Sequence, residues 1–417
     1  MKRKQNTTNC KVISIKLSLS KKQIFQCREL QKEAGRCYSD MIIAHVNSRK
    51  DKWLSESELK SQFKGGYNIH SQSVQAVAEK IDTAVNSART NREREFKLIG
   101  KIETEYPSKP KSYFTVVWKR LGIQVKEGKI YLSNGRGKEP LILSLPYKYI
   151  TKNICQAELI YDADVYYLNI SIETGKENPP LLRNVKTAGL DLGEIHIGAC
   201  TIEDGNTIIV SGRHLRSIKQ LRNKKHASLR SKIDKCKNNS LKQKKLKKAQ
   251  RKVSAKFTRR QKDILHKASR KIVSFCIENQ VAHLAVGDVR NIADGVNLGK
   301  KCNQKLSQWA YGLFLNYITY KLREVGINLH IINEAYSSKT CSYCSHVKKS
   351  SVQGRNYHCS NPECKKKVHR DANGSANICS KQRYGKYAKV QVTKIKYLRP
   401  VKITVRSSPS EAGHVAI

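Results

Sequence analysis

The feature that most restricts the fold of this chain is a group of four cysteines in its last hundred residues. Two residues separate Cys341 from Cys344, four separate Cys359 from Cys364, and fourteen lie between the two pairs. Such pairs can present four thiolates to one tetrahedral Zn²⁺, and the long spacer then forms a ribbon or knuckle. The alternative, four free thiols in a loop, is disfavoured because the segment has too few apolar residues to fold unaided. Four thiolates leave no open coordination position, so the sequence predicts structural rather than catalytic zinc.

The second constraint is charge. Of the 417 residues, 81 are Lys or Arg and 33 are Asp or Glu, which gives a formal net charge of +48. The plainer interpretation is a solvated basic surface, but a charge of this size repels itself unless a polyanion neutralises it. The composition therefore favours a nucleic-acid partner. An anionic membrane is the weaker option, because the sequence has no transmembrane stretch and no lipidation signal.

The cysteine usage and the N-terminal segment indicate a cellular compartment. The opening MKRKQNTTNCKVISIKLSLS lacks the apolar core and the small-residue cleavage site of a secretory signal. Nine of the thirteen cysteines are scattered singly, which fits a reducing compartment better than a disulfide framework. We expect an intracellular, cytoplasmic protein associated with the nucleoid, with no membrane partner.

The N-terminal part of the chain changes its hydrophobic period twice. Residues 10–18 alternate as a strand, residues 20 to about 105 show the three- and four-residue spacing of helices, and residues 113–173 return to strand patterns. Within the last stretch, GIQVKEGKIYLSN predicts a hairpin around Glu127–Gly128. This order predicts a β-barrel or sheet with helices inserted between its first two strands, followed by a linker at 175–186.

The C-terminal part begins with two strands joined at Asp204–Gly205 and continues with a long helical pair broken near 238–240. Between residues 214 and 271 there are 23 Lys or Arg and two acids, which favours binding to a phosphate backbone over a merely solvated face. The apolar strand VAHLAVGDV, a helix and the strand INLHIIN, which runs into Glu334, follow. We expect the basic tail from 381 to 417 to be poorly ordered without partners.

Two aspartates lie in unusual surroundings. Asp191 lies in an apolar strand, AGLDLG, where a carboxylate needs a partner such as a bound cation; the plainer alternative is a turn at an edge strand. Asp371 lies at a loop-to-helix junction in HRDANGSANI, where an N-cap is the plainer role. Neither signal is specific alone, but the zinc module lies between Glu334 and Asp371. Carboxylates flanking a zinc module in a basic chain suggest a metal-dependent nuclease.

In combination, these motifs resemble one known family. The order LDLG, basic helical hairpin, apolar strand, YxSxTC, four cysteines and HRDxNxxAN is similar to that of the TnpB (OrfB) family, over roughly residues 187–380. Its members are transposon-encoded, RNA-guided DNA endonucleases related to the compact type V CRISPR effectors and to the eukaryotic Fanzor proteins. The preceding strand–helices–strands order is also similar to the family's wedge barrel with an inserted recognition lobe.

The resemblance implies an α+β, multidomain architecture. The wedge β-barrel would comprise residues 1–19 and 106–175, with a helical recognition lobe at 20–105. An RNase H-like (RuvC) α/β nuclease domain would comprise 186–340 and 365–380, with a zinc-binding insertion at 341–364 and the flexible tail at 381–417. In such a domain two aspartates and a glutamate hold two divalent cations, Mg²⁺ or Mn²⁺, that cleave a phosphodiester.

The resemblance assigns Asp191 and Asp371 to the first and last acids of that site, but the middle acid is missing. The family usually carries Glu-Asp after its second apolar strand, whereas this chain has Gly287 followed by Asp288. Neighbouring strand residues point to opposite faces, so Asp288 cannot simply substitute. One explanation is loss of activity. The other explanation, which we favour, is relocation of the acid to Glu334. The alternative role for Glu334 is that of a surface acid near the zinc knuckle.

Five further residues are weaker candidates. Glu194 and His196 follow Asp191 and would touch the site unless they are packed or solvated. His369 and Arg370 precede Asp371 and are candidates for phosphate contacts, and Tyr336 is a candidate for stacking on a base, although packing against the zinc loop is the alternative.

The sequence thus predicts a TnpB-like, RNA-guided DNA endonuclease. Its expected partners are a guide RNA from the transposon end and double-stranded target DNA. Two other functions stay open at this point: a cleavage-deficient, RNA-guided DNA-binding regulator, and a guide-independent transposase or nuclease accessory protein.

Overall fold

The computed structural model describes residues 10–173, 186–289, 299–350, 352 and 354–401. The chain divides into two compact units, Met1–Glu177 and Asn178–Ile417, and the division falls inside the predicted linker. In the described residues, no helix has both the length and the apolar character needed to cross a membrane.

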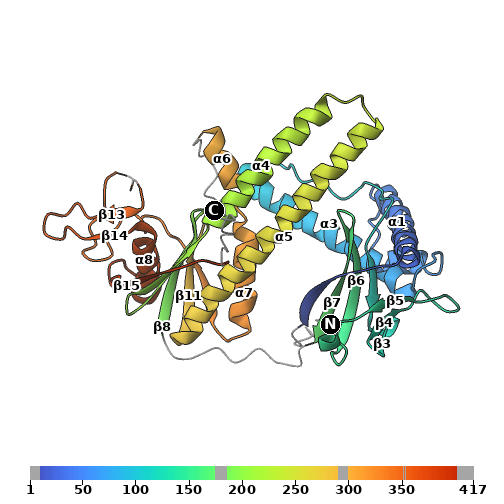
Figure 1. Ribbon diagram of the computed structural model, residues 1–417, viewed down its shortest axis with the longest axis horizontal. Coiled ribbons are helices and arrows are strands. Elements are labelled where there is room, and N and C mark those ends of the chain that lie inside the picture. The colour runs from blue at the N-terminus through green and yellow to red at the C-terminus, as the bar shows by residue number, and fades with distance from the viewer. Residues whose placement is uncertain (1–9, 174–185, 290–298, 351, 353, 402–417) are drawn as a thin grey trace, which may run out of the picture. The chain divides into compact units, whose positions relative to one another are not determined.

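The first unit contains two antiparallel sheets and three α-helices (Figure 1). Its strands are β1 (Cys10–Lys16), β2 (Val116–Lys119), β3 (Ile123–Lys126), β4 (Lys129–Leu132), β5 (Leu141–Ser144), β6 (Ile154–Asp162) and β7 (Val165–Glu173). Its helices are α1 (Lys21–Ser48), α2 (Glu56–Gln62), α3 (Ser71–Ile99) and the short 3₁₀ turns η1 (Arg120–Gly122) and η2 (Tyr147–Tyr149).

The first and last strands of this unit are neighbours. β1 pairs antiparallel with β7, from Cys10 opposite Glu173 to Lys16 opposite Tyr167, and the order of this sheet is β1-β7-β6-β2. The three helices are therefore inserted between two strands of one sheet, as predicted. Strands β3, β4 and β5 form the second sheet. The strands belong to two sheets, so a closed barrel stays a prediction.

One hydrophobic core joins the helices and strands of the first unit, so the expected barrel and helical lobe share their packing. Met41 of α1, Ile81 of α3 and Trp118 of β2 are all buried in it. Local signals agree with the pattern: the predicted hairpin turn at Glu127–Gly128 has positive φ at both residues, +48° and +72°, as a tight two-residue turn requires.

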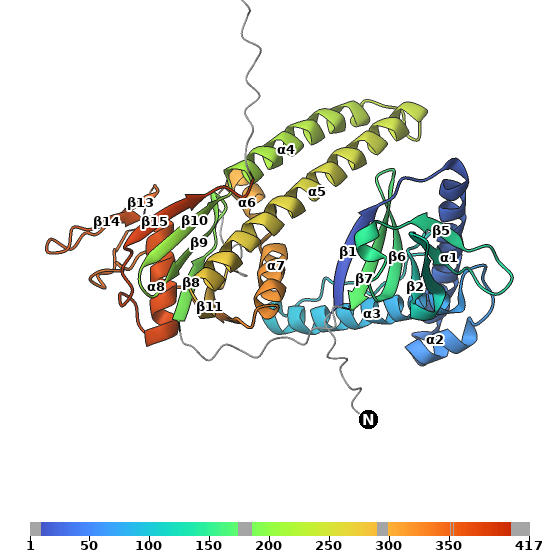
Figure 2. The same ribbon diagram turned by 60° about the horizontal axis from the view of Figure 1, so that its bottom comes forward.

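The second unit is built on a six-stranded mixed sheet (Figures 1 and 2). Its strands are β8 (Lys186–Asp191), β9 (His196–Ile202), β10 (Asn206–Ser211), β11 (Val281–Gly287), β12 (Asn328–Ile332) and β15 (Lys394–Leu398), and a separate hairpin contains β13 (Asn356–His358) and β14 (Lys367–His369). Its helices are α4 (Arg213–Asp234), α5 (Leu241–Glu278), α6 (Lys300–Ser307), α7 (Tyr311–Arg323) and α8 (Arg370–Tyr384).

The order of strands in this sheet is β12-β11-β8-β9-β10-β15. β9 runs antiparallel to both of its neighbours, β8 and β10, whereas β11 runs parallel to β8, β12 parallel to β11, and β15 parallel to β10. Helices α5 and α7 cover one face, where Leu190 and Ile208 are buried, and α8 covers the other, where Ala199 and Ile209 are buried. This arrangement fits the expected RNase H-like domain.

The basic helical pair has the predicted break. α4 ends at Asp234, and α5 begins at Leu241 after the N-cap Ser240, whose hydroxyl accepts the backbone N–H of Gln243. In both views the two helices form a long antiparallel hairpin whose tip extends away from the sheet of this unit (Figures 1 and 2). The 38 residues of α5 correspond to about 57 Å of helix.

The expectation of a poorly ordered tail is wrong for its first part. β15 pairs with β10 over five residues, from Lys394 opposite Asn206 to Leu398 opposite Val210, and Val390 is buried. A strand of five residues with two exposed lysines gives a weak pattern, and the pairing with β10 stabilises it. Residues 402–417 lie outside the described residues.

Candidate functional site

The four cysteines converge at one point. Their sulfur atoms all lie within 4.8 Å of one another, with 3.9 Å between Cys341 and Cys364 and 3.5 Å between Cys344 and Cys359. Zn–S bonds of about 2.3 Å in a tetrahedron require sulfurs roughly 3.8 Å apart, so the spacing suits zinc. The β13–β14 hairpin brings the second pair to the first.

Backbone groups support this cluster in the manner of a zinc knuckle. The N–H groups of Tyr343 and Cys344 donate to the sulfur of Cys341, and that of His346 donates to the sulfur of Cys344. Burial nevertheless raises the pKa of Cys341 to about 12, whereas the hydrogen bonds to Cys344 outweigh its burial and lower its pKa. These N–H groups would stabilise thiolates on Cys341 and Cys344, the form in which cysteine binds Zn²⁺.

The helix that carries Asp371 lies very close to the strand that carries Asp191. A Cβ at Gly189 would overlap the carbonyl of Ser375 and the backbone N of Cys379 in α8. The run of small residues in HRDANGSAN is therefore the packing face of α8 on β8. This close approach also brings Asp191 against α8, since a Cβ at Gly374 would lie 2.7 Å from Asp191 Oδ2.

Asp371 lies in the first turn of α8, and a histidine, not this aspartate, is the N-cap. His369 Nδ1 accepts the backbone N–H of Asp371 at 3.2 Å. The carboxylate Oδ2 of Asp371 lies 2.7 Å from Nδ1 of His196, which is the first residue of β9. The rings of His196 and His369 meet edge to face with centroids 5.0 Å apart, and their nitrogens and Asp371 lie within 4.8 Å of one another.

Two arginines complete the surroundings of Asp371. Arg370 Nε lies 3.5 Å from Oδ1, and Arg355 Nη1, from the zinc module, lies 3.7 Å from Oδ2. Burial tends to raise the pKa of Asp371, but the His196 hydrogen bond and the neighbouring His369 and Arg370 charges outweigh it and lower the pKa. Asp371 is therefore ionised and held from three sides.

Glu334 follows β12, the neighbour of β11. A Cβ at Gly287, the last residue of β11, would overlap the Glu334 carboxylate, with 2.8 Å to its Cδ. Glu334 Oε2 is buried and has no hydrogen-bond partner among the described residues. Burial, followed by the charge of Asp288, raises the pKa of Glu334.

The electrostatics link the three predicted acids. Burial, then the charges of Asp371 and Glu334, raise the pKa of Asp191 well above its usual value, and Arg370 opposes them. In the described residues, the carboxylate oxygens of Asp191, Glu334 and Asp371 do not all lie within 4.8 Å of one another.

The weaker candidates divide into two groups. His196, His369 and Arg370 surround Asp371, as described above. Glu194 instead pairs with Arg216 of α4 at 3.4 Å, and Tyr336 is 64% exposed with φ of +65° rather than packed on the zinc loop. Arg355 was not among the residues predicted from the sequence, because only the β13–β14 pairing places its guanidinium beside Asp371.

Comparisons with known proteins cover most of the second unit. A family model described as a probable transposase (OrfB_IS605) matches residues 169–293, and one described as the TNB domain of Cas12f1-like proteins matches residues 311–378. A TnpB-like protein of Methanocaldococcus jannaschii is 28% identical over 169 residues. These are 40% of this chain and 59% of that relative, so the match spans less than two thirds of its length.

A solved structure shares the fold over a longer stretch. The Cas12f1 chain in a Cas12f1–sgRNA–target DNA complex superposes with a TM-score of 0.57 at 18% identity, covering 86% of this chain and 82% of that one. At this identity the likeness concerns the fold alone. The two family models and the TnpB-like relative thus show that residues 169–378 are similar to TnpB (OrfB) proteins and their Cas12f1-like relatives.

Proposed function

We propose that this protein is an RNA-guided DNA endonuclease that cleaves DNA by divalent-metal-dependent phosphodiester hydrolysis and is associated with a transposable element. The observation that carries the proposal is the position of Glu334. Its carboxylate fills the space of a side chain at Gly287, has a buried oxygen with no hydrogen-bond partner among the described residues, and acts electrostatically on Asp191. The second unit is then the RuvC-like nuclease domain, and the first unit is the wedge with its recognition helices.

The three acids fit a pair of hard divalent cations. Carboxylate oxygens suit Mg²⁺ or Mn²⁺, and burial, followed by the charges of Asp371 and Glu334, raises the pKa of Asp191. Asp191, Glu334 and Asp371 would hold the ions. When bound, such ions activate a water molecule and stabilise the leaving oxygen of a phosphodiester.

Other residues of the site orient the acids and receive the substrate. His196 fixes one oxygen of Asp371, and Arg355 and Arg370 balance its charge while offering further donors to a DNA phosphate on the same side. Cys341, Cys344, Cys359 and Cys364 would hold structural Zn²⁺, which fixes the hairpin that carries Arg355.

The basic hairpin α4–α5 supplies the surface for the guide RNA and its heteroduplex with DNA. Its lysines and arginines line both helices and far outnumber the acids there, and cations at this density bind phosphate backbones without reading sequence. Base pairing would then supply most of the sequence specificity, while the protein reads a short flanking motif on the DNA.

Plasmid cleavage tests the proposal. The protein is co-expressed with RNA transcribed from the DNA that flanks its gene and is offered plasmids that carry the guide-matched target beside randomised flanks. We expect cleavage by wild type and by the surface control Glu324→Ala, and none by Asp191→Ala or Glu334→Ala. Absence of cleavage by wild type would refute the endonuclease, and activity in Glu334→Ala would refute the relocated acid.

One observation favours a second candidate, a cleavage-deficient, RNA-guided DNA-binding regulator. Asp371 is engaged by His196, Arg355 and Arg370, and the three acids are not gathered within one coordination sphere. In the same experiment this candidate predicts guide-dependent retention of intact plasmid by wild type. Retention that is unchanged in Asp191→Ala, without cleavage by any variant, would identify the regulator.

A further inference from the structure

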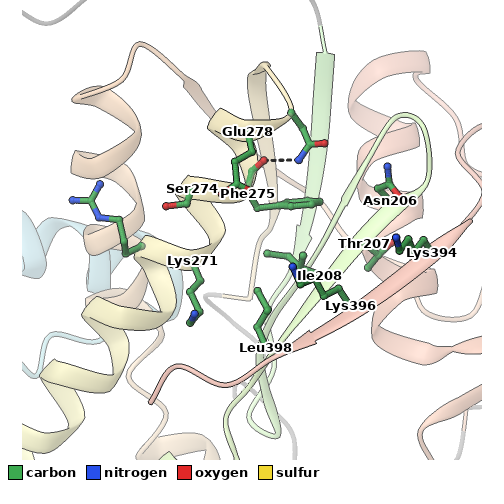
Figure 3. A pocket seen from close by; sticks show the side chains of 12 residues that line it. Asn206, Thr207, Ile208, Lys271, Ser274, Phe275, Glu278, Lys394, Lys396 and Leu398 are labelled. Carbon is green, nitrogen blue, oxygen red and sulfur yellow. Dashed lines mark hydrogen bonds between the residues drawn. The ribbon is translucent and has the colours of Figure 1, made fainter. Parts of the chain in front are cut away.

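A groove separate from the acidic site lies between α5 and the edge strands β10 and β15 (Figure 3). Its volume is about 510 Å³. Ile208, Phe275 and Leu398 supply apolar surface, and Figure 3 shows the ring of Phe275 pointing from α5 toward the strands. This volume lies in the range of about 300–1,000 Å³ that is typical of sites enclosing small organic groups.

Four cations line this groove. Arg270 and Lys271 come from α5, and Lys394 and Lys396 come from β15, where alternate residues share one face with Leu398. Within the described part of the chain, none of the four forms an ion pair, and Glu278 is the one acid of the lining. These positive charges are complementary to phosphate groups, and the apolar surface beside them is complementary to a flat apolar group of the same ligand.

The groove opens on the face of the sheet opposite to the predicted catalytic acids. Asp191 lies against α8, on the same face as Gly189, whereas Ile208 and Leu398 pack with the core beneath α5. A nucleotide bound in the groove is therefore not the nucleotide presented to Asp191. One wall, β15, also lies beyond the residues that the two family models match, so the groove is not part of that similarity.

We propose that this groove binds a single-stranded segment of the guide RNA, with one base stacked on Phe275 and the flanking phosphates on Arg270, Lys394 and Lys396. The inference rests on the proposed function for the identity of the strand, since the guide is the polynucleotide that is not cut. A duplex does not fit, because its bases are stacked inside, whereas an unpaired nucleotide can present a base to an aromatic ring.

Photo-crosslinking identifies the strand in the groove. Phe275 is replaced by p-azidophenylalanine in the full chain, the complex with guide RNA and target DNA is irradiated, and the RNA and both DNA strands carry different labels. We expect a crosslink to the RNA that maps to one unpaired stretch. A crosslink to DNA, or none in a complex that still cleaves, would overturn the RNA site but leave the endonuclease standing.

Charge variants provide an independent measurement. Lys394→Gln with Lys396→Gln should weaken guide binding on the order of tenfold and reduce the slope of log affinity against log salt by about 1.4, for two lost single-strand phosphate contacts. The matched control is Lys126→Gln with Lys129→Gln, two exposed lysines paired across β3 and β4. Equal losses in both pairs would mean general charge attraction and overturn the site. A wild-type protein that binds no RNA would refute both the groove and the guided function.

Discussion

The Glu334 carboxylate occupies the space that a side chain on Gly287 would require. Gly287 ends β11, and Glu334 lies two residues beyond the end of the neighbouring parallel strand β12, so a carboxylate from either position can reach the same point beside Asp191. The carboxylate of Glu334 can therefore lie here only because residue 287 has no side chain. This arrangement predicts that the acid can be moved back.

The first prediction is a rescue by exchange. Glu334→Gly should lower cleavage by more than the roughly 10–100-fold cost of losing an outer-shell partner of a metal site, because it removes a metal ligand. Adding Gly287→Glu to this variant should restore part of the activity, since the space is then free. Gly287→Glu alone should be inactive or unstable because two carboxylates compete for one place. A double variant no more active than Glu334→Gly would exclude the exchange.

The parts of the site predicted from sequence are those whose signals are local. Asp191, Asp371 and the cysteines stand at strand ends, helix starts and fixed spacings, and the structure places each where its pattern indicated. Glu334 was predicted as a site residue because Gly287 stands where the family usually carries a glutamate. Its burial in that space could be seen only from the pairing of β11 with β12.

The parts that the sequence did not reveal depend on tertiary pairing. Arg355 looks like one basic residue among many in the zinc spacer, and only the β13–β14 hairpin turns it toward Asp371. His196 was only a weaker candidate, with packing or solvation as the alternative, because the sequence does not show that β9 brings its ring to Asp371. β15 is short and basic, and its order comes from the free edge of β10.

The second prediction concerns His196. His196→Gln should raise the Mg²⁺ concentration that gives half-maximal cleavage on the order of tenfold, because Asp371 loses the group that orients its Oδ2. Cleavage at saturating Mg²⁺ should recover most of the wild-type rate. His283→Gln, which disturbs a histidine pair with His330 on β11 and β12, is the control. Equal Mg²⁺ dependence of wild type and His196→Gln would contradict the positioning role.

The third prediction concerns zinc. Purified wild type should contain one Zn²⁺ per chain by elemental analysis, and Cys341→Ser should lose it together with much of the soluble yield, because the knuckle has little apolar packing of its own. Cys302→Ser is the control, since Cys302 is exposed and distant in sequence from the cluster. Unchanged zinc content in Cys341→Ser would exclude the four-cysteine site.

The fourth prediction concerns the contact between β8 and α8. Gly189→Ala should destabilise the second unit by about 1–3 kcal/mol or more, because the added methyl overlaps backbone atoms of Ser375 and Cys379 that have no free space. Gly312→Ala is the control: it lies in α7 with open space around its Cβ, and replacing a helical Gly by Ala stabilises by up to about 1 kcal/mol. Chemical denaturation of both variants measures the difference, and similar stabilities would contradict the close packing.

The fifth prediction concerns the buried amine of Lys321 in α7. It donates to the His266 carbonyl at 2.7 Å and to the Ser269 hydroxyl at 2.5 Å, and burial, with the charge of Arg270, lowers its pKa to about 8. The unfolded chain, with an ordinary lysine pKa of about 10.4, therefore binds more protons than the folded chain between these values. Stability from this group rises with pH across that window, by at most about 3 kcal/mol.

Unfolding of wild type and Lys321→Met at pH 7.5, 8.5, 9.5 and 10.5 measures this dependence, since the methionine variant lacks the titrating group. Wild type should gain stability relative to Lys321→Met as pH rises from about 8 toward 10.4, because the cost of burying the ammonium disappears. The exposed Lys262→Met on α5 should show no such trend. A constant difference between wild type and Lys321→Met would mean that the amine stays charged in the folded protein.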